Sequence, residues 1–391
     1  MFTKLFAVTL LGTTALIITL FPDQNPVTAS PQQSKTNPKI EIVFVLDTTS
    51  SMEGLLSAAK EKIWSIASTM ASAQPAPEIK IGLVAFRDRG DQYITQVADL
   101  NSDLDYIYTN LMRYRAEGGG DMPESVNQAL YDAVHHISWS SDSDTYKVIF
   151  LVGDAPPHMD YPNEMKFPDI IRSAQQKNII INTIQCGQQQ ATRPYWQQIA
   201  QLGKGDFLHV NQQGNAIAIA TPYDEELAAL SSELDDTRHY YGSAEQKAAS
   251  KEKVAAAEKL REDASIASRA RRALFNATES GQKNFIGAND IIEDLRQGRV
   301  ELESLTEESL PASIQAIAPE ERPSFIQKTK DKRNEITASI QQLAKKRQDY
   351  IKEELKNIPD VQTSLDNQIF ETIKQQAKEK GINYLADEPV Y

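Results

Sequence analysis

The chain has 391 residues, of which 40% are hydrophobic and 24% are charged, and its 54 acidic and 41 basic side chains give a formal net charge of −13 at pH 7. This length and hydrophobic content suffice for at least one substantial core and suggest two domains. Because an anionic surface repels phosphate backbones, we expect no nucleic-acid partner, whereas metal cations and basic proteins remain compatible with the charge.

The N-terminus combines Lys4, an apolar run at 5–20 and a polar stretch that ends in Val27-Thr28-Ala29. This order of segments predicts a secretory signal peptide at 1–29, cleaved after Ala29, and a flexible leader at 30–38. The alternative is an uncleaved anchor, although about sixteen apolar residues fall short of the roughly twenty that cross a bilayer. We therefore expect a secreted or periplasmic protein, with membrane contact only if the segment is retained.

From residue 39 onward, predicted strands alternate with predicted helices. The alternation predicts an α/β fold, a doubly wound, Rossmann-like and mostly parallel six-stranded sheet with helices on both faces, at residues 39–235. A short polar link centred on Gly90 favours a hairpin and hence one antiparallel edge strand. Strands are expected at 40–47, 79–86, 94–98, 147–153, 179–186 and 207–210, and helices at 55–73, 103–112, 124–137, 167–177 and 195–202. The single cysteine, Cys186, should be a buried, inert thiol in a central strand.

After about residue 242 the strand pattern ends, and residues 243–391 are predicted to form an all-α domain or stalk. Residues 244–277 are rich in strong helix formers, and Ser243 with Gln246 matches a capping box at their start. Further helices are expected at 319–357 and 365–380, with Gly381 as a stop. Because no heptad pattern is sustained, a helical domain or stalk is favoured over a long coiled coil.

Oxygen-bearing side chains gather in three loops that follow a strand or precede a helix. The first is Asp47-Thr48-Thr49-Ser50-Ser51, directly after an apolar strand, and the third contains Asp154 and His158. The second, at 117–124, has three glycines that would let the backbone approach closely. In open α/β sheets functional groups collect at the carboxyl ends of strands. Carboxylate and hydroxyl ligands suit Mg²⁺ or Mn²⁺ rather than zinc or copper.

These three loops, in this order, resemble the metal-ion-dependent adhesion site of the von Willebrand factor A domain, and the resemblance covers residues 39 to about 235. Asp47, Thr49 and Ser51 match the family's Asp-x-Ser-x-Ser element with one Thr for Ser, and Asp154 matches its fourth-strand Asp. The resemblance implies that the two hydroxyls bind the cation directly and that the two carboxylates bind it directly or through water. The three motifs together look most like the hemicentin-type branch, and the tail is similar to bacterial secreted proteins that join this domain to helices.

The second loop departs from the family pattern, because Asp121 stands where the family usually has Thr. If Asp121 takes the place of that Thr as a ligand, three carboxylates surround one divalent cation, which should raise metal affinity and weaken the ion as a Lewis acid towards a partner's carboxylate. The alternative is a capping box, with Asp121 as N-cap, Pro123 in the first turn and Glu124 reaching back to the cap. Glu124 and His158 are expected beside the ligands, where they could orient them.

Two short motifs have plainer explanations than function. Arg89-Gly90-Asp91 spells the tripeptide that integrins recognise, but Gly90 is needed for the hairpin and such a triplet also arises by chance. Asn276-Ala277-Thr278 is a glycosylation sequon that has meaning only in a eukaryotic secretory route.

The sequence therefore predicts a secreted or periplasmic metal-dependent adhesion or interaction module that binds a protein through a polar or acidic group at the cation. One alternative is a scaffold with a structural metal, whose helical region carries the interaction. A Mg²⁺-dependent hydrolase is disfavoured, because phosphatases of the haloacid-dehalogenase type need a second Asp where Thr49 stands, and no other catalytic motif is present. We expect no enzyme activity.

Overall fold

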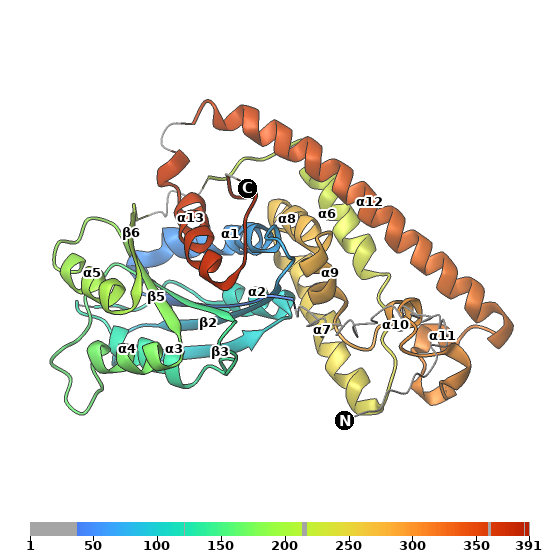
Figure 1. Cartoon of the computed structure of the whole chain (residues 1–391), viewed down its shortest axis with the longest axis horizontal. Coiled ribbons are helices and arrows are strands. Elements are labelled where there is room, and N and C mark those ends of the chain that lie inside the picture. Colours follow the sequence, from blue (N-terminus) through green and yellow to red (C-terminus); the bar gives the residue numbers. More distant parts are fainter. Residues whose placement is uncertain (1–36, 121, 213–216, 359–360, 387, 391) are drawn as a thin grey trace, which may run out of the picture. The chain divides into compact units, whose positions relative to one another are not determined.

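The computed structural model describes residues 37–120, 122–212, 217–358, 361–386 and 388–390 (Figure 1). Residues from Asn37 onward form one compact unit. The predicted signal peptide and most of the leader lie outside the described residues. Within the described part of the chain, none of the helices combines the length and the apolar character that a membrane span requires.

Six strands of the described chain form one sheet in the order β3-β2-β1-β4-β5-β6. Their bounds are β1 Lys39–Asp47, β2 Glu78–Phe86, β3 Thr95–Asn101, β4 Tyr146–Gly153, β5 Ile179–Cys186 and β6 Lys204–Val210. Only the edge pair β2 and β3 is antiparallel, and all other neighbours are parallel. The predicted fold class is confirmed, including the hairpin around Gly90.

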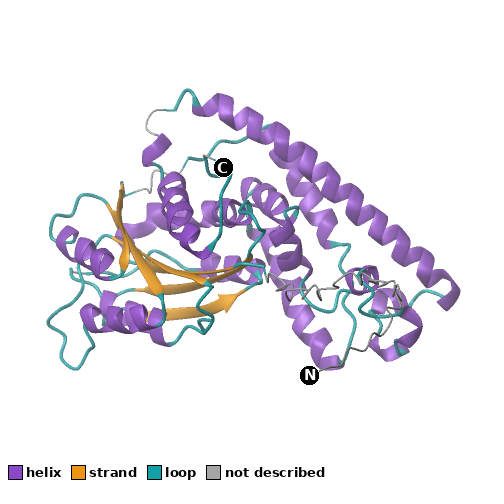
Figure 2. Cartoon of the chain, in the orientation of Figure 1, coloured by secondary structure: helices purple, strands orange, loops and turns teal. Residues whose placement is uncertain are grey.

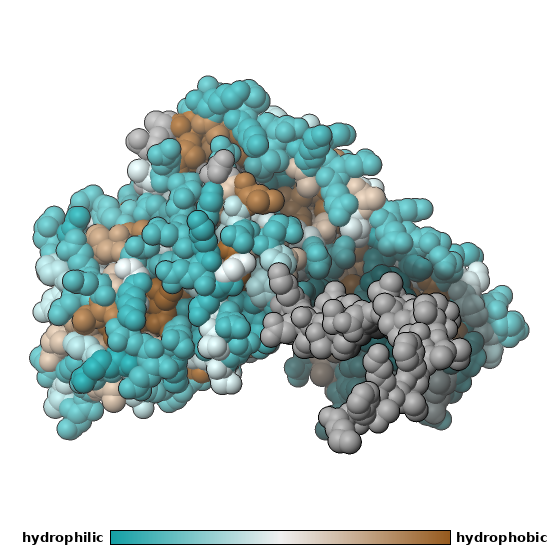
Figure 3. Space-filling model, viewed as in Figure 1, coloured by the Kyte–Doolittle hydropathy of each residue, from teal (hydrophilic) through white to brown (hydrophobic). Residues whose placement is uncertain are grey.

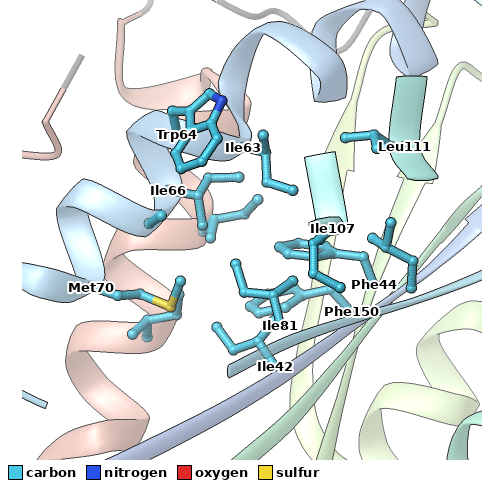
Figure 4. Close-up of a cluster of buried hydrophobic side chains, with 14 of the residues drawn as sticks. Ile42, Phe44, Ile63, Trp64, Ile66, Met70, Ile81, Ile107, Leu111 and Phe150 are labelled. Atoms are coloured by element: carbon cyan, nitrogen blue, oxygen red, sulfur yellow. The ribbon is translucent and has the colours of Figure 1, made fainter. Parts of the chain in front are cut away.

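Alternate residues of β1 enter two different cores, as expected for a strand covered on both faces. Ile42 and Phe44 pack with α1 (Glu53–Ala71) and α2 (Leu104–Arg113), whereas Val43 and Val45 pack with helices on the opposite face. Those helices are α3 (Val126–His135), α4 (Phe167–Gln176) and α5 (Arg193–Leu202). Figure 2 shows helices along both sides of the sheet, and Figure 4 shows Ile42, Phe44, Ile81 and Phe150 of the strands meeting side chains of α1 and α2. The described residues visible in Figure 3 are mostly hydrophilic, so the apolar side chains are largely internal.

The rest of the described chain is helical, as predicted. Its helices are α6 Asp224–Asp235, α7 Ala244–Asp263, α8 Ile266–Asn276, α9 Glu279–Ile286, α10 Ile291–Arg296, α11 Ala312–Gln315, α12 Arg322–Leu355 and α13 Leu365–Ala377. Short 3₁₀ turns lie at Ser50–Met52, Leu302–Ser304, Glu307–Ser309, Pro319–Glu321, Val361–Thr363 and Lys378–Lys380. The capping box of Ser243 and Gln246 is confirmed. The single helix expected at 244–277 is wrong: Ala264 is extended, and Ser265 caps a new helix, α8.

The helical region shares a core with the sheet domain. Phe275 of α8 packs against Trp64 of α1, with ring centroids 5.9 Å apart. The buried guanidinium of Arg272 pairs with Asp105 of α2 at 2.6 Å and with Asp235 of α6 at 2.8 Å. A buried ion pair left without one partner is strongly destabilising, so these contacts tie α8 firmly to the sheet domain.

The last long helix, α13, lies over the sheet beside α1 and β6 (Figure 1). Gln376 connects α13 to three strands: its amide donates to Asn182 of β5 at 2.8 Å and to Asp206 of β6 at 3.2 Å, and its oxygen accepts from the Tyr146 hydroxyl of β4 at 2.9 Å. Asn182 and Tyr146 are buried. The Tyr146 hydroxyl and the Asn182 Nδ2, which donates to Gln376 Oε1 at 3.2 Å, therefore depend on Gln376 for partners.

Replacing Gln376 by Ala should lower the free energy of unfolding by about 2 kcal/mol, because it leaves buried polar atoms of Asn182 and Tyr146 unpaired. The measurement is urea unfolding of the full chain. Gln375→Ala is the matched control, since this neighbouring side chain is exposed and should change stability by no more than about 0.5 kcal/mol. Equal effects of the two variants would contradict the assignment.

The glycosylation sequon Asn276-Ala277-Thr278 has its acceptor asparagine buried in the fold. Asn276 is buried at the end of α8, and the hydroxyl of Thr278 both donates to Phe275 and accepts from the Gly281 amide. Attachment of a glycan would therefore require this helix end to open.

Cys186 is buried as predicted, and burial raises the pKa of its thiol far above the usual range.

Candidate metal centre

The first loop folds back over the carboxylate that ends β1. Asp47 Oδ1 accepts hydrogen bonds from the Thr49 amide at 2.9 Å and from the Thr49 hydroxyl at 2.7 Å. The Thr49 and Ser51 hydroxyls are 3.4 Å apart. The structure thus brings together all three predicted ligands of this loop, and the 3₁₀ turn Ser50–Met52 leads directly into α1.

The third loop lies beside the first because β1 and β4 are parallel neighbours, with Leu46 opposite Val152. Asp154 therefore follows β4 next to Asp47, and the pKa of Asp47 is raised by burial and then by the charge of Asp154. Gly153 permits this approach, since a Cβ there would lie 3.0 Å from the Cβ of Asp47. The Thr192 hydroxyl donates to the Asp154 carbonyl at 2.7 Å and fixes the backbone of the loop.

The glycines of the second loop let it pass close to the first. Gly118 and Gly119 have φ values of +76° and +73°, which favour glycine, and a Cβ on Gly119 would lie 2.9 Å from the Cβ of Thr49. The Ser50 amide and hydroxyl both donate to the Gly118 carbonyl, at 3.2 and 2.8 Å. The close approach predicted for these glycines is confirmed for Gly118 and Gly119.

Asp121 lies outside the described residues, so its role as a ligand stays a prediction. The capping-box alternative is wrong, because it needs a helix that starts beside Asp121, whereas α3 begins at Val126 with Ser125 as its N-cap. Glu124 instead forms an isolated parallel bridge with the third loop: its amide donates to Pro156 at 3.0 Å, and its carbonyl accepts from His158 at 3.1 Å.

The side chain of Glu124 points towards the first loop rather than into solvent. Its residue is only 3% exposed, and Oε1 would lie 3.3 Å from a Cβ on Gly119, the same glycine that crowds Thr49. Oε2 is buried without a hydrogen-bond partner among the described residues, and so is Oδ2 of Asp47. Glu124 was expected beside the ligands, and its burial makes it a candidate ligand itself.

Among the described residues, no Lys or Arg compensates the charge of Asp47 or Glu124. Burial, followed by the charge of Asp154, raises the pKa of Asp47 to about 7. Burial, followed by the charges of Asp47, Asp88, Asp91 and Asp154, raises the pKa of Glu124 to about 9. A buried carboxylate ionises at its usual pH only when a cation or donor compensates it.

The donor set fits a hard divalent cation. Among the described residues, no three His, Cys, Asp or Glu side chains are grouped tightly enough to hold an ion by themselves. The hydroxyls of Thr49 and Ser51 would therefore have to complete the set. Oxygen donors of this mixed kind are those that Mg²⁺ and Mn²⁺ accept.

Polar groups around Asp88 contact Ser125 and His158, the residues that adjoin Glu124 in the chain and in the bridge to the third loop. The buried Asp88 carboxylate accepts from the Ser125 hydroxyl at 2.7 Å and the Tyr161 hydroxyl at 2.6 Å, and lies 3.3 Å from His158 Nε2. The other ring nitrogen of His158 is 2.7 Å from Asp160. His158 therefore contacts Asp88 and the Glu124 backbone, and its role in orienting a metal ligand stays a prediction. Sequence reasoning missed Asp88, although an acid two residues after β2 carries the same signal as Asp47.

The Arg89-Gly90-Asp91 tripeptide is used inside the fold. The Asp91 carboxylate accepts from the Gly119 amide at 3.2 Å and from the Asp88 amide at 3.2 Å. The guanidinium of Arg89 lies 3.9 Å from the ring centre of Tyr161 and pairs with Glu164 at 3.1 Å. These contacts give the triplet a structural role, because Asp91 holds the second loop in place.

Gln212 was also missed by the sequence reasoning. It lies two residues beyond β6, and its side-chain amide contacts both the first and the third loop. The only signal in the sequence is a polar residue shortly after a strand. That signal is too common to single out one side chain.

Comparison with known proteins supplies a family for the sheet domain. Residues 41–220 match the family model of the von Willebrand factor A domain. A protein of Acanthamoeba polyphaga mimivirus, described as an ariadne-like RING finger protein, is 27% identical over 119 residues, which are 30% of this chain. The match covers only 11% of the length of that relative.

Solved structures also resemble part of the chain, among them the following two. A von Willebrand factor type A protein from Catenulispora acidiphila is 17% identical with a TM-score of 0.34, over 44% of this chain and 39% of that chain. Proximal thread matrix protein 1 from the mussel byssus, with a zinc-occupied MIDAS motif, is 17% identical with a TM-score of 0.35, over 44% of this chain and 42% of that chain.

Proposed function

Residues 41–220 form a von Willebrand factor A domain, and from this premise we propose that the protein is a metal-dependent protein-binding module. Domains of this family are generally interaction modules rather than enzymes. In the proposed function, Mg²⁺ or Mn²⁺ at the carboxyl edge of the sheet joins the domain to a polar or acidic group of a partner protein. The hemicentin-type branch, the predicted signal peptide and a secreted or periplasmic location belong to the same proposal and rest on the sequence.

The observation that carries the proposal is a pair of buried carboxylate oxygens without partners among the described residues, Asp47 Oδ2 and Glu124 Oε2. Ionised carboxylates in such a place are costly unless a cation compensates them. Two hydroxyls that can ligate a cation, those of Thr49 and Ser51, lie beside Asp47. A divalent cation bound by Asp47 Oδ2 and the two hydroxyls would supply the missing positive charge, and Glu124 would join it as a further ligand.

The proposed ligands are Asp47, Thr49, Ser51 and Asp154, with Glu124 added by its burial. Asp121 remains a predicted ligand. Even without Asp121, three carboxylates would face two positive charges, so the bound cation keeps a net negative surrounding. A partner's neutral polar group, or one that binds through water, therefore suits this site better than a carboxylate of the partner. The chemistry supplied by the cation is attraction and orientation of that group.

The proposal predicts that partner binding is reversible by metal removal. Partners captured on the immobilised full chain in the presence of Mg²⁺ should be released by excess chelator, return when Mg²⁺ is restored, and be absent with Asp47→Ala. The readout is the identity and amount of the captured proteins by mass spectrometry. Glu117→Gln serves as the control, because the side chain of Glu117 is 61% exposed and Gln keeps an acceptor oxygen for its 3.7 Å contact with Arg87. A partner that stays bound in chelator contradicts a bridging cation.

The scaffold alternative, in which the helical region carries the binding, cannot be tested by truncating the chain after Tyr241. Removing α8 and α13 would uncover Trp64 and other side chains of the shared core. Substitutions of exposed residues on α12 are the appropriate variants, since they leave that core intact. Loss of chelator-resistant binding in such variants would favour the scaffold alternative.

A further inference from the structure

Gln212 joins two of the three loops of the metal centre through one side chain. Its Nε2 donates to Asp154 Oδ2 at 2.7 Å and to the Ser51 carbonyl at 2.8 Å. We infer that Gln212 is a positioning residue of the metal centre, which holds Asp154 and the first loop in the arrangement that a cation requires. The inference rests on the proposed function, because positioning of a ligand matters only where a cation binds.

The geometry leaves one oxygen of Asp154 available. Gln212 occupies Oδ2, whereas Oδ1 has no hydrogen-bond partner among the described residues. A carboxylate held by one oxygen keeps its rotation restricted and can still present the other oxygen to an ion. Groups that hold metal ligands in this way commonly contribute 10-fold to 100-fold to metal affinity.

An amide is suited to this place because it donates hydrogen bonds without carrying charge. A cationic donor beside Asp154 would compete electrostatically with a divalent cation for the same carboxylates. The fold also makes room for the amide: Gly187, with φ of +72°, stands where a Cβ would lie 2.1 Å from Gln212 Oε1. The ends of β4, β5 and β6 therefore meet around this one side chain.

Two hydrogen bonds fix the backbone just before Gln212, and one of them comes from the helical region. The His209 carbonyl accepts from the side chain of Gln368 on α13 at 3.1 Å, and the Val210 carbonyl accepts from the Gly187 amide at 3.0 Å. Residues more than 150 positions later in the chain thus help to place a side chain at the metal centre. This contact gives the helical region a direct role in the geometry of the site.

The test is calorimetric titration of the full chain with Mn²⁺. Gln212→Ala should weaken Mn²⁺ binding about tenfold, in line with other groups that hold metal ligands. Gln212→Met should weaken it equally, because Met keeps the length of the side chain but has no N–H donor. The matched control is Gln189→Ala, at an exposed Gln near the same sheet edge whose side chain, among the described residues, hydrogen-bonds with the Met122 sulfur alone, at 3.8 Å. This control should stay within about twofold of wild type, well inside the tenfold effect.

Several outcomes overturn the inference. Gln212→Met with wild-type affinity would show that packing suffices, and tighter binding by either variant would show that the amide competes with the cation. Thermal unfolding of the metal-free variants is measured in parallel, and a lowered midpoint with unchanged Mn²⁺ affinity would make Gln212 merely structural. Wild-type protein that binds no Mn²⁺ would overturn the proposed metal-dependent function as well, whereas normal wild-type binding with unaffected variants overturns this inference alone.

Discussion

The metal-free protein should lose several kcal/mol of stability as the pH rises from about 4 to about 9, and saturating Mg²⁺ should abolish most of that loss. In the folded chain the pKa of Asp47 is about 7 and that of Glu124 about 9, against ordinary values of 3.8 and 4.5. Between the ordinary and the raised values the folded state binds more protons than the unfolded state, so stability falls as pH rises.

The expected size follows from the shift of Asp47. Each pKa unit corresponds to about 1.4 kcal/mol, so a shift of about three units contributes roughly 4 kcal/mol, lost between the ordinary value and about 7. Glu124 extends the loss towards pH 9. The charge of Asp47 contributes to the raised pKa of Glu124, so their contributions are not additive. A bound cation replaces the protons as the compensating charge and should flatten the profile.

The measurement is urea unfolding of the full chain at a series of pH values, with chelator and with saturating Mg²⁺. The variant with both Asp47→Asn and Glu124→Gln serves as the control, since it should show a much smaller slope in chelator. Stability in chelator that stays level or rises over this pH range would contradict the electrostatic description of the site.

Asp47→Asn should reduce Mg²⁺ affinity at least about 100-fold while making the metal-free protein more stable at about pH 8. Asn keeps the shape of Asp and an oxygen that can accept from the Thr49 amide and hydroxyl, so the first loop should stay folded. It removes a buried negative charge that repels Asp154 and Glu124. The cation loses a charged ligand, and the metal-free fold loses a repulsion.

Glu124→Gln should act in the same two directions, with a loss of Mg²⁺ affinity of about tenfold or more. Calorimetry measures the affinity, and urea unfolding in chelator measures the stability. Glu117→Gln changes an exposed carboxylate in the same stretch of chain but keeps an acceptor oxygen for its 3.7 Å contact with Arg87, so it should alter neither quantity appreciably. A Glu124→Gln variant that binds Mg²⁺ like wild type would remove Glu124 from the ligand set, and a destabilised Asp47→Asn variant would mean that no repulsion exists there.

Some parts of the site follow from local sequence because they depend on one strand and the residues directly after it. The apolar run before Asp47 is buried on both faces of the sheet, and parallel pairing of β1 with β4 then brings Asp47 and Asp154 to the same edge. The glycines of the second loop are informative for the same reason, since a positive φ at Gly118 and Gly119 is a property of the residue type. The ends of strands and the freedom of glycine backbone are short-range information, whereas the pairing of β1 with β4 joins segments far apart in the chain.

Other parts depend on contacts between distant segments. Ala264 lies within a run of strong helix formers, yet the chain bends there so that α8 can place Phe275 on Trp64 and Arg272 on Asp105. Buried packing of this kind outweighs the few tenths of a kcal/mol per residue that helix propensity contributes. Glu124 likewise fits the pattern of a helix cap, but pairing of its backbone with Pro156 in the third loop directs it to the carboxylates instead.

By itself, the sequence determined the α/β fold with its one antiparallel edge, the all-α character of the rest, and three loops whose oxygen-bearing side chains suit a hard cation. Only the tertiary structure decided that Glu124 is buried against the first loop, that Asp88 and His158 support it, and that Gln212, held in place by α13, connects Asp154 to Ser51. The physical reason is range: hydrophobic period and turn chemistry act over a few residues, whereas burial and hydrogen-bond partners depend on which distant segments pack together.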